Sequence, residues 1–91
     1  MAALRLVITG RVQGVGFRAW TRREARRRGL RGWVRNRADG SVEALFIGDE
    51  TALAAMAEAS WRGPPVSEVR DIAHHPAEDD GSPGFEERPT V

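Results

Sequence analysis

Hydrophobic and polar side chains alternate at the start of the chain and then change to helical spacing. Leucine or isoleucine occupies every second position from Leu4 to Ile8, which predicts a β-strand with one buried face that ends at Gly10. A helix is predicted over residues 17–28, because Gly29 is a favourable stop and the arginines before it suit the negative end of a helix dipole. The segment between strand and helix contains three glycines and is predicted to be a loop.

The rest of the chain alternates between the same two periods. A hairpin is predicted around Asp39-Gly40, a residue pair that favours tight turns between antiparallel strands. A second helix is predicted between Gly48 and Pro65, with acidic residues at its start and a Gly-Pro-Pro run at its end. The strands predicted after the first are residues 32–37, 41–47, 66–75 and a short final one at 85–91.

These elements have the order β-α-β-β-α-β, with the short final strand as an addition. Each β-α-β unit crosses right-handedly, and the hairpin joins the two units. The simplest packing is one antiparallel sheet with both helices on one face, so we predict an α+β fold of the ferredoxin-like α/β sandwich type. At 91 residues the chain is expected to form a single domain, residues 1–91. This fold serves many functions, so the function has to come from particular residues.

The amino-acid composition excludes several kinds of chemistry and indicates the cellular location to expect. The chain contains no cysteine, which excludes disulfides, thiol catalysis and cysteine-ligated metals. No apolar run approaches the roughly 20 residues that span a bilayer, and the first residues lack the layout of a signal peptide. We therefore expect a cytoplasmic protein and, at this size, a monomer.

The charges are distributed unevenly along the chain. All 14 basic residues are arginines, and eleven of them lie in residues 5–37 together with a single acid, Glu24. The other twelve acids lie in residues 39–87. The N-terminal part is therefore electropositive, as expected if it receives an anion.

The glycine-rich loop has the features of a phosphate-binding site. Glycines allow backbone conformations in which successive N–H groups turn inward and form an anion-binding concavity. The helix that follows directs its positive end at the same place, and Arg18 in its first turn adds a guanidinium that can form two parallel hydrogen bonds with a phosphate. The loop matches neither a Walker A motif nor a dinucleotide-binding loop. The residues by themselves predict an anion site and leave its ligand open.

Three stretches of the sequence resemble the signatures of the acylphosphatase family. Gly-Arg-Val-Gln-Gly-Val-Gly-Phe-Arg at residues 10–18 is similar to the first signature. Gly-Trp-Val-Arg-Asn at 32–36, with Asp-Gly-Ser-Val-Glu at 39–43, is similar to the second. Gly-Pro-Pro at 63–65 also fits the pattern, and the resemblance runs from about Leu4 to Ile72 in the right order and spacing.

The resemblance implies a hydrolase that cleaves the carboxyl–phosphate bond of acyl phosphates to carboxylate and inorganic phosphate. Arg18 matches the family's phosphate-binding arginine, and Asn36 matches the asparagine that positions the attacking water. Backbone N–H groups of the family's loop would hold the phosphate oxygens; in this chain they belong to Gln13, Gly14, Val15, Gly16, Phe17 and Arg18. Arg37 and residues 85–91 depart from the family pattern, which affects the last strand and the substrate preference and not the reaction.

The resemblance also implies which partners to expect. Neither a metal ion nor an organic cofactor is implied. The expected partners are a small acyl phosphate as substrate and inorganic phosphate as product inhibitor, with no nucleic acid and no membrane. His74 and His75 do not change this expectation, because neighbours on a strand point to opposite faces and do not easily share one ion.

Several of these residues have simpler interpretations. Asn36 in isolation would be a turn residue at a strand end, and the side chain of Gln13 either orients the loop or touches the substrate. The arginines of residues 22–28 are interpreted as a solvated helix face in preference to a nucleic-acid patch. Packing in the core or against loops is expected for the aromatic residues Phe17, Trp20 and Trp33.

Two other functions compete with catalysis. The first is a binding module that holds a phosphate or carbamoyl phosphate for a larger partner, and turnover distinguishes it from an enzyme. The second is an RNA-binding domain of the same fold, which requires exposed aromatic residues on central strands. The predicted strands offer mainly Trp33 and Phe46 for that purpose.

Overall fold

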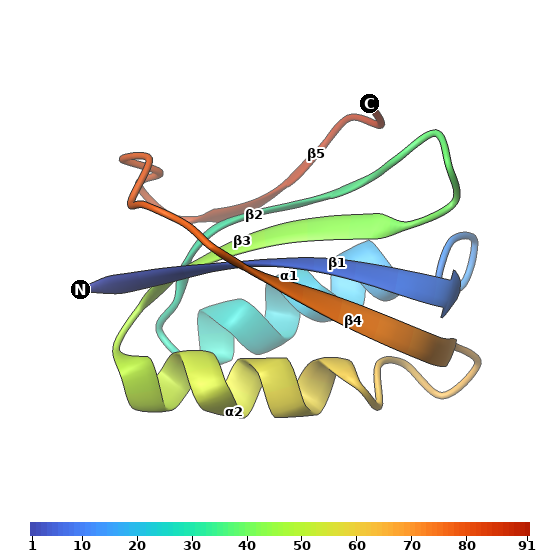
Figure 1. Ribbon diagram of the computed structural model, residues 1–91, viewed down its shortest axis with the longest axis horizontal. Helices are drawn as coiled ribbons and strands as arrows, with labels where there is room; N and C mark the ends of the chain where they lie inside the picture. The colour runs from blue at the N-terminus through green and yellow to red at the C-terminus, as the bar shows by residue number, and fades with distance from the viewer.

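Five strands form one sheet, and both helices lie against the same face of it (Figure 1). The computed structural model describes all 91 residues. Its elements are β1 (Ala2–Arg11), α1 (Phe17–Arg27), β2 (Arg31–Asn36), β3 (Val42–Gly48), α2 (Glu50–Ser60), β4 (Glu68–Pro76) and β5 (Phe85–Arg88). The predicted order and the ferredoxin-like α+β fold are confirmed, and most boundaries differ from the predicted ones by one or two residues.

The sheet has the strand order β4-β1-β3-β2-β5. The first four strands are antiparallel to their neighbours, as predicted, but β5 pairs in parallel with β2. The reason is the path of residues 77–84, which carry the chain from the end of β4 across the helix-free face to the edge beyond β2 (Figure 1). Because β4 ends where β2 begins, the new strand runs in the direction of β2. The complete sheet therefore contains both antiparallel and parallel pairs of strands. β5 ends at Arg88, whereas the strand predicted from the sequence extended to Val91.

A β-bulge between β1 and β4 explains an irregular apolar spacing. Val69 and Ile72 are three positions apart, so a regular strand would point them to opposite faces. Arg70 is the extra residue of the bulge, because Gly10 pairs with Val69 and Thr9 already pairs with Asp71. Both apolar side chains consequently face the core.

Gly10 belongs to this bulge and lies within β1, outside the loop to which the sequence assigned it. A Cβ atom at Gly10 would overlap the carbonyl oxygen of Glu68 on the neighbouring strand. The glycine is therefore explained by the close approach of two strands and needs no contact with an anion.

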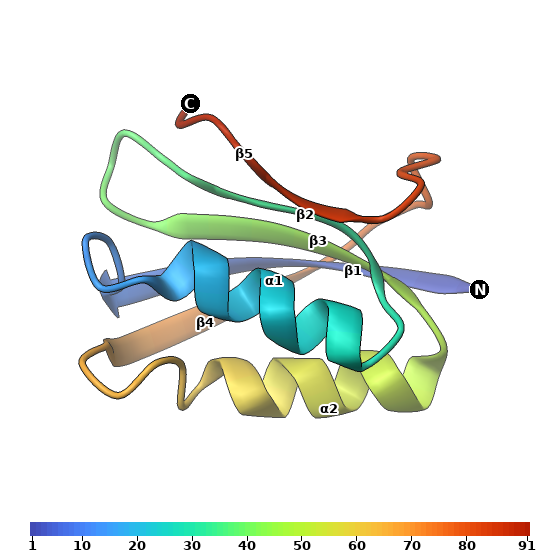
Figure 2. The same ribbon diagram turned by 180° about the vertical axis from the view of Figure 1, so that it is seen from behind.

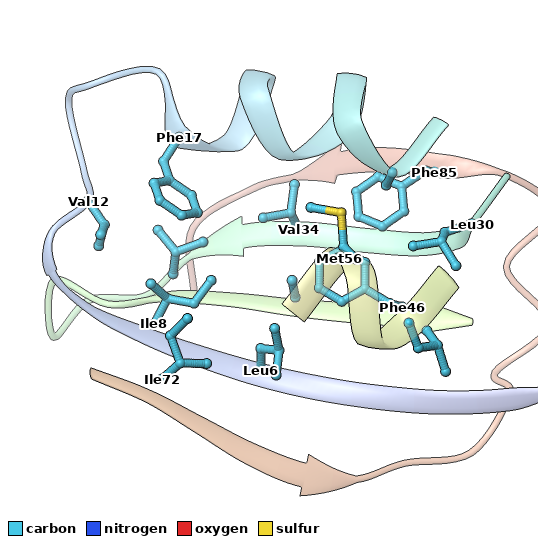
Figure 3. Packing of buried hydrophobic residues seen from close by; sticks show 14 residues of the cluster. Leu6, Ile8, Val12, Phe17, Leu30, Val34, Phe46, Met56, Ile72 and Phe85 are labelled. Carbon is cyan, nitrogen blue, oxygen red and sulfur yellow. The ribbon is translucent and has the colours of Figure 1, made fainter. Parts of the chain in front are cut away.

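The main core lies between the sheet and the two helices (Figure 3). Phe46 and Phe85 stack there with ring centroids 5.5 Å apart, so β5 is anchored to the centre of the sheet. Val12 and Phe17, at the two ends of the loop after β1, are each only 1% exposed and point into the same core. The loop between them is thus held at both ends by buried apolar side chains.

The helix-free face of the sheet is covered by side chains and by the loop after β4. Trp33 is buried there under the guanidinium groups of Arg35 and Arg88, 4.5 and 5.1 Å from its ring centroid. Its Nε1–H donates to a carboxylate oxygen of Asp80 at 3.1 Å. Phe46 is fully buried on the other face. Neither aromatic ring is available as the stacking platform that the RNA-binding alternative requires.

Candidate active site

The segments singled out in the sequence meet at one end of the molecule. Figure 2 shows the loop between β1 and α1 close to the turn between β2 and β3, with the C-terminal end of the chain beside that turn and the N-terminus at the opposite end. The backbone of Val91 fixes this arrangement, because its N–H donates to the carbonyl of Asn36 at 3.1 Å and its carbonyl accepts from Ala38 N–H at 2.7 Å. Residues far apart in the sequence therefore frame a common site.

The loop presents a run of backbone donors. None of the N–H groups from Gln13 to Arg18 donates a hydrogen bond to another group of the protein. The last of them belong to the first turn of α1, where helix geometry leaves N–H groups without partners and the helix dipole is positive. A series of such donors on a curved backbone is an anion-binding feature.

Two glycines give the loop its curvature. Gly14 and Gly16 have φ angles of 73° and 79°, in the left-handed region that other residues rarely occupy. No atom lies near the position of a Cβ at either glycine, so the requirement comes from the backbone conformation itself. Gly16 is also the N-cap of α1 and has no capping side chain, which leaves the helix N-terminus open toward the loop.

A small cavity brings the two predicted catalytic side chains together. It has a volume of about 140 Å³, several times the roughly 30 Å³ that one water molecule occupies in the liquid. Arg18 and Asn36 both line it, and neither side chain forms a hydrogen bond or ion pair with the rest of the protein. The residues that line the cavity are Val12, Gly14, Gly16, Phe17, Arg18, Ala19, Asn36 and Glu87.

Gln13 points away from this cavity and toward the hairpin turn. Its side-chain Nε2 donates to the carbonyl of Arg37 at 2.8 Å and to that of Ser41 at 2.9 Å. These bonds tie the middle of the loop to the turn that follows Asn36. Of the two interpretations of Gln13, the structure favours the one in which its side chain orients the loop, and the cavity lining does not include it.

The hairpin turn is stabilised by Asp39. One carboxylate oxygen of Asp39 accepts hydrogen bonds from the hydroxyl and the backbone N–H of Ser41, at 2.6 and 2.9 Å. The hydrogen bond from the Ser41 hydroxyl, followed by that from its N–H, lowers the pKa of Asp39. The ionised carboxylate thus supports the turn that places Asn36 at the cavity.

Most arginines on α1 have partners within the protein. Arg22 forms an ion pair with Glu87 at 3.2 Å, Arg27 and Arg28 pair with Glu24, and Arg26 donates to the carbonyl of Phe85. The hydrogen bond from Arg27 is the main cause that lowers the pKa of Glu24. This pairing favours a solvated helix face over a nucleic-acid patch.

Glu87 is a cavity residue that was not predicted from the sequence. Strand alternation contained the signal, since Phe85 and Glu87 are two positions apart on β5 and therefore face the same side of the sheet. Phe85 is buried in the core beneath the helices, so Glu87 faces α1. Recognising this from sequence requires knowing that β5 lies beside β2.

No group of three or more histidine or acidic side chains in the structure is placed to hold a metal ion. Neither helix is both long and apolar enough to cross a membrane.

Known proteins are similar to this chain in both sequence and fold. A family model described as acylphosphatase matches residues 4–87. The acylphosphatase of Acidiphilium cryptum is 52% identical over 90 residues that cover 99% of each chain. The crystal structure of acylphosphatase from Bacillus subtilis matches with a TM-score of 0.93 and 44% identity, over 97% of this chain and 99% of that one.

A larger protein contains a similar domain. Full-length HypF, in a phosphate- and nucleotide-bound form, matches with a TM-score of 0.85 and 27% identity over 98% of this chain but only 12% of HypF. The relatives that match end to end are instead stand-alone proteins of the same length as this one. The chain therefore belongs to the acylphosphatase family and is an enzyme of acyl phosphate hydrolysis.

Proposed function

We propose that the enzyme holds the phosphoryl group of an acyl phosphate in the loop from Gln13 to Arg18 and cleaves it by in-line attack of a water positioned by Asn36. The observation that carries this proposal is the cavity in which the loop and Arg18 meet Asn36, with backbone N–H groups that have no acceptor in the protein. The Arg18 guanidinium can donate two parallel hydrogen bonds to phosphate oxygens, and the loop N–H groups can serve the others.

The leaving group explains why so few side chains are needed. A carboxylate whose conjugate acid has a pKa of about 4 departs without being protonated, so no general acid is required at the leaving oxygen. The barrier then depends on the charge carried by the three equatorial phosphoryl oxygens. Fixed N–H donors and a guanidinium directed at these oxygens stabilise that charge.

Asn36 has the chemistry to orient a water and not to deprotonate it. Its side-chain oxygen can accept a hydrogen bond from the water and direct a water lone pair at phosphorus. An amide is too weak a base to remove the proton, so we assign the proton to a phosphoryl oxygen of the substrate. The P–O bond to water forms, the P–O bond to the acyl group breaks, and its electron pair leaves with the carboxylate.

The test is hydrolysis of an aromatic acyl phosphate by the purified protein, with and without excess chelator. We expect turnover that chelation leaves unchanged and that inorganic phosphate inhibits competitively, because the product oxygens fit the same donors. An Arg18→Ala preparation purified in parallel measures spontaneous and contaminating hydrolysis. Activity lost on chelation and restored by a divalent ion would exclude a metal-free reaction. A rate unaffected by saturating phosphate, at substrate below KM, would exclude the loop as the site.

The alternative is a phosphate-binding module without turnover, and the HypF structure that matches this chain is in a phosphate- and nucleotide-bound form. Such a module would bind inorganic phosphate with the same loop and lose binding in Arg18→Ala, yet show no hydrolysis above the control. The mutual coverage of 99% with a stand-alone acylphosphatase supports the enzyme. A single domain, a monomeric state and a cytoplasmic location remain proposals from the sequence, and gel filtration tests the second of them.

A further inference from the structure

An acidic side chain lines the cavity in which an anion is proposed to bind. Glu87 lies on β5, which packs against α1, and it lines the same cavity as Arg18 and Asn36. A carboxylate at this position repels a bound phosphate and is a potential partner for the Arg18 guanidinium. The affinity of the proposed site for phosphate therefore depends on which group pairs with the Glu87 carboxylate.

Arg22 binds it. Arg22 follows Arg18 by one helical turn, and residues four positions apart on a helix are surface neighbours. The Nη1 atom of Arg22 lies 3.2 Å from a carboxylate oxygen of Glu87, while Arg18 forms no ion pair. The two paired side chains are 38% and 30% exposed, so the pair adds little to the stability of the fold.

We propose that Arg22 is a positioning residue that keeps Glu87 from pairing with Arg18 and so preserves the affinity of the site for phosphate. The inference rests on the proposed function, because it assumes that Arg18 binds the phosphoryl group. Without Arg22, the Glu87 carboxylate turns to the Arg18 guanidinium. The substrate then has to displace this carboxylate before it can bind. Glu87 in turn limits how tightly the product phosphate is held.

A double-mutant cycle tests this inference with four proteins: wild type, Arg22→Gln, Glu87→Gln and the double variant. The readouts are Kd for inorganic phosphate, kcat and KM for an aromatic acyl phosphate, and thermal unfolding. We expect Arg22→Gln to weaken phosphate binding on the order of 2- to 5-fold, with KM raised and kcat nearly unchanged, as for a competing ion pair. Glu87→Gln should tighten phosphate binding, and the double variant should match Glu87→Gln.

The decisive measurement is whether the change in Kd caused by Arg22→Gln depends on the presence of Glu87. If Arg22→Gln weakens phosphate binding equally with and without Glu87, Arg22 acts only through its long-range charge, and the inference is overturned. A change in unfolding temperature without a change in Kd assigns the pair a purely structural role and overturns it as well. Arg23→Gln is the matched control, because Arg23 is exposed, carries no ion pair and lies on the same helix. It should leave Kd close to the wild-type value, and an equal loss there would also overturn the inference.

Arg18→Ala separates this inference from the proposed function. If Arg18→Ala still binds phosphate like the wild type, the proposed site is wrong. If it loses binding while Arg22→Gln binds normally, the site stands and only the role of Arg22 is rejected.

Discussion

Two hollows lie on opposite faces of β2, and only the smaller one has the donors for an anion. The cavity at Arg18 measures about 140 Å³, whereas the hollow on the helix-free face measures about 430 Å³ and is lined by Arg5, Arg35 and Arg37. Every guanidinium of the larger hollow has a carboxylate partner, because Arg5 and Arg35 both bind Glu43 and Arg37 lies 4.0 Å from Asp39. Arg18 has no such partner.

The two hollows differ in their donors, because the smaller one has an unpaired guanidinium and backbone N–H groups without acceptors, whereas the guanidinium groups of the larger one are paired. Glu43 is placed by register, since it lies directly opposite Arg35 on the neighbouring strand. The same alternation turns Asn36 toward the helices and the residues on either side of it toward the open face. One short strand thus separates a cluster of ion-paired arginines from a proposed catalytic group.

The largest effect is expected from Arg18→Lys. Lysine keeps the charge but loses the planar fork, so kcat/KM should fall on the order of 10²-fold or more. Arg5→Lys makes the same chemical change in the paired hollow and should leave kcat/KM unchanged. Steady-state kinetics measures kcat/KM for both variants, and thermal unfolding establishes that they are folded. Near-wild-type kinetics in folded Arg18→Lys would remove this side chain from the site.

Asn36→Ala should separate binding from catalysis. If the side chain only orients water, kcat falls roughly 10- to 10²-fold while inorganic phosphate binds with close to native affinity. Turnover, phosphate affinity and thermal unfolding are measured on one preparation. A variant that loses activity only in proportion to its folded fraction identifies Asn36 as a structural turn residue. A stable variant with ordinary turnover refutes the role in water positioning.

Glu43→Gln should turn the paired hollow into a weak anion site. The substitution frees Arg5 and Arg35, and phosphate titration should then reveal a second, weaker binding event that the wild type lacks. Loss of the charged hydrogen bonds should lower stability by about 1–3 kcal/mol, with kcat unchanged. If the folded variant binds no additional phosphate, unpaired guanidinium groups alone do not make a site, and the backbone donors of the loop carry the difference.

The smallest effect is expected on protein stability at low pH, where protonation of Asp39 weakens the hairpin turn. The folded-state pKa of Asp39 is lowered from its unfolded value of about 4. Its contribution to stability is therefore complete above that pH and is lost as the pH falls through the lower folded-state pKa. Asp39→Asn should be slightly less stable than the wild type at neutral pH, and the difference should shrink below about pH 4. Unfolding temperatures measured from pH 2.5 to 6 check this, and a constant difference would contradict it.

Local signals made the main elements and the loop predictable from sequence. The alternation from Leu4 to Ile8 and the Asp39-Gly40 turn each concern a few neighbouring residues, and the structure has both features. Gly10 was assigned to the loop because its close approach to Glu68 depends on a strand almost sixty residues away. The parallel pairing of β5 was missed for the same reason, since it follows from the route of the preceding loop across the open face.

The site was predictable in part. The glycine-rich loop and helix start indicated Arg18, the family resemblance indicated Asn36, and the cavity brings the two together, but local sequence does not reveal which arginines have carboxylate partners. That depends on cross-strand and helix–strand partners such as Glu43 and Glu87. Counting charges along the chain identified the electropositive half, but it did not identify which guanidinium lines the proposed phosphate cavity.

The two hydrogen bonds from Gln13 to the hairpin have a consequence for protein engineering. Exposed turns of small and polar residues such as Ala38–Gly40 are usually tolerant sites for inserted peptides. Here the carbonyls at the base of the turn hold the proposed phosphate-binding loop in register with Asn36. An insertion that leaves the fold intact should still pull these carbonyls apart and separate the loop from the side chain that is proposed to position the water.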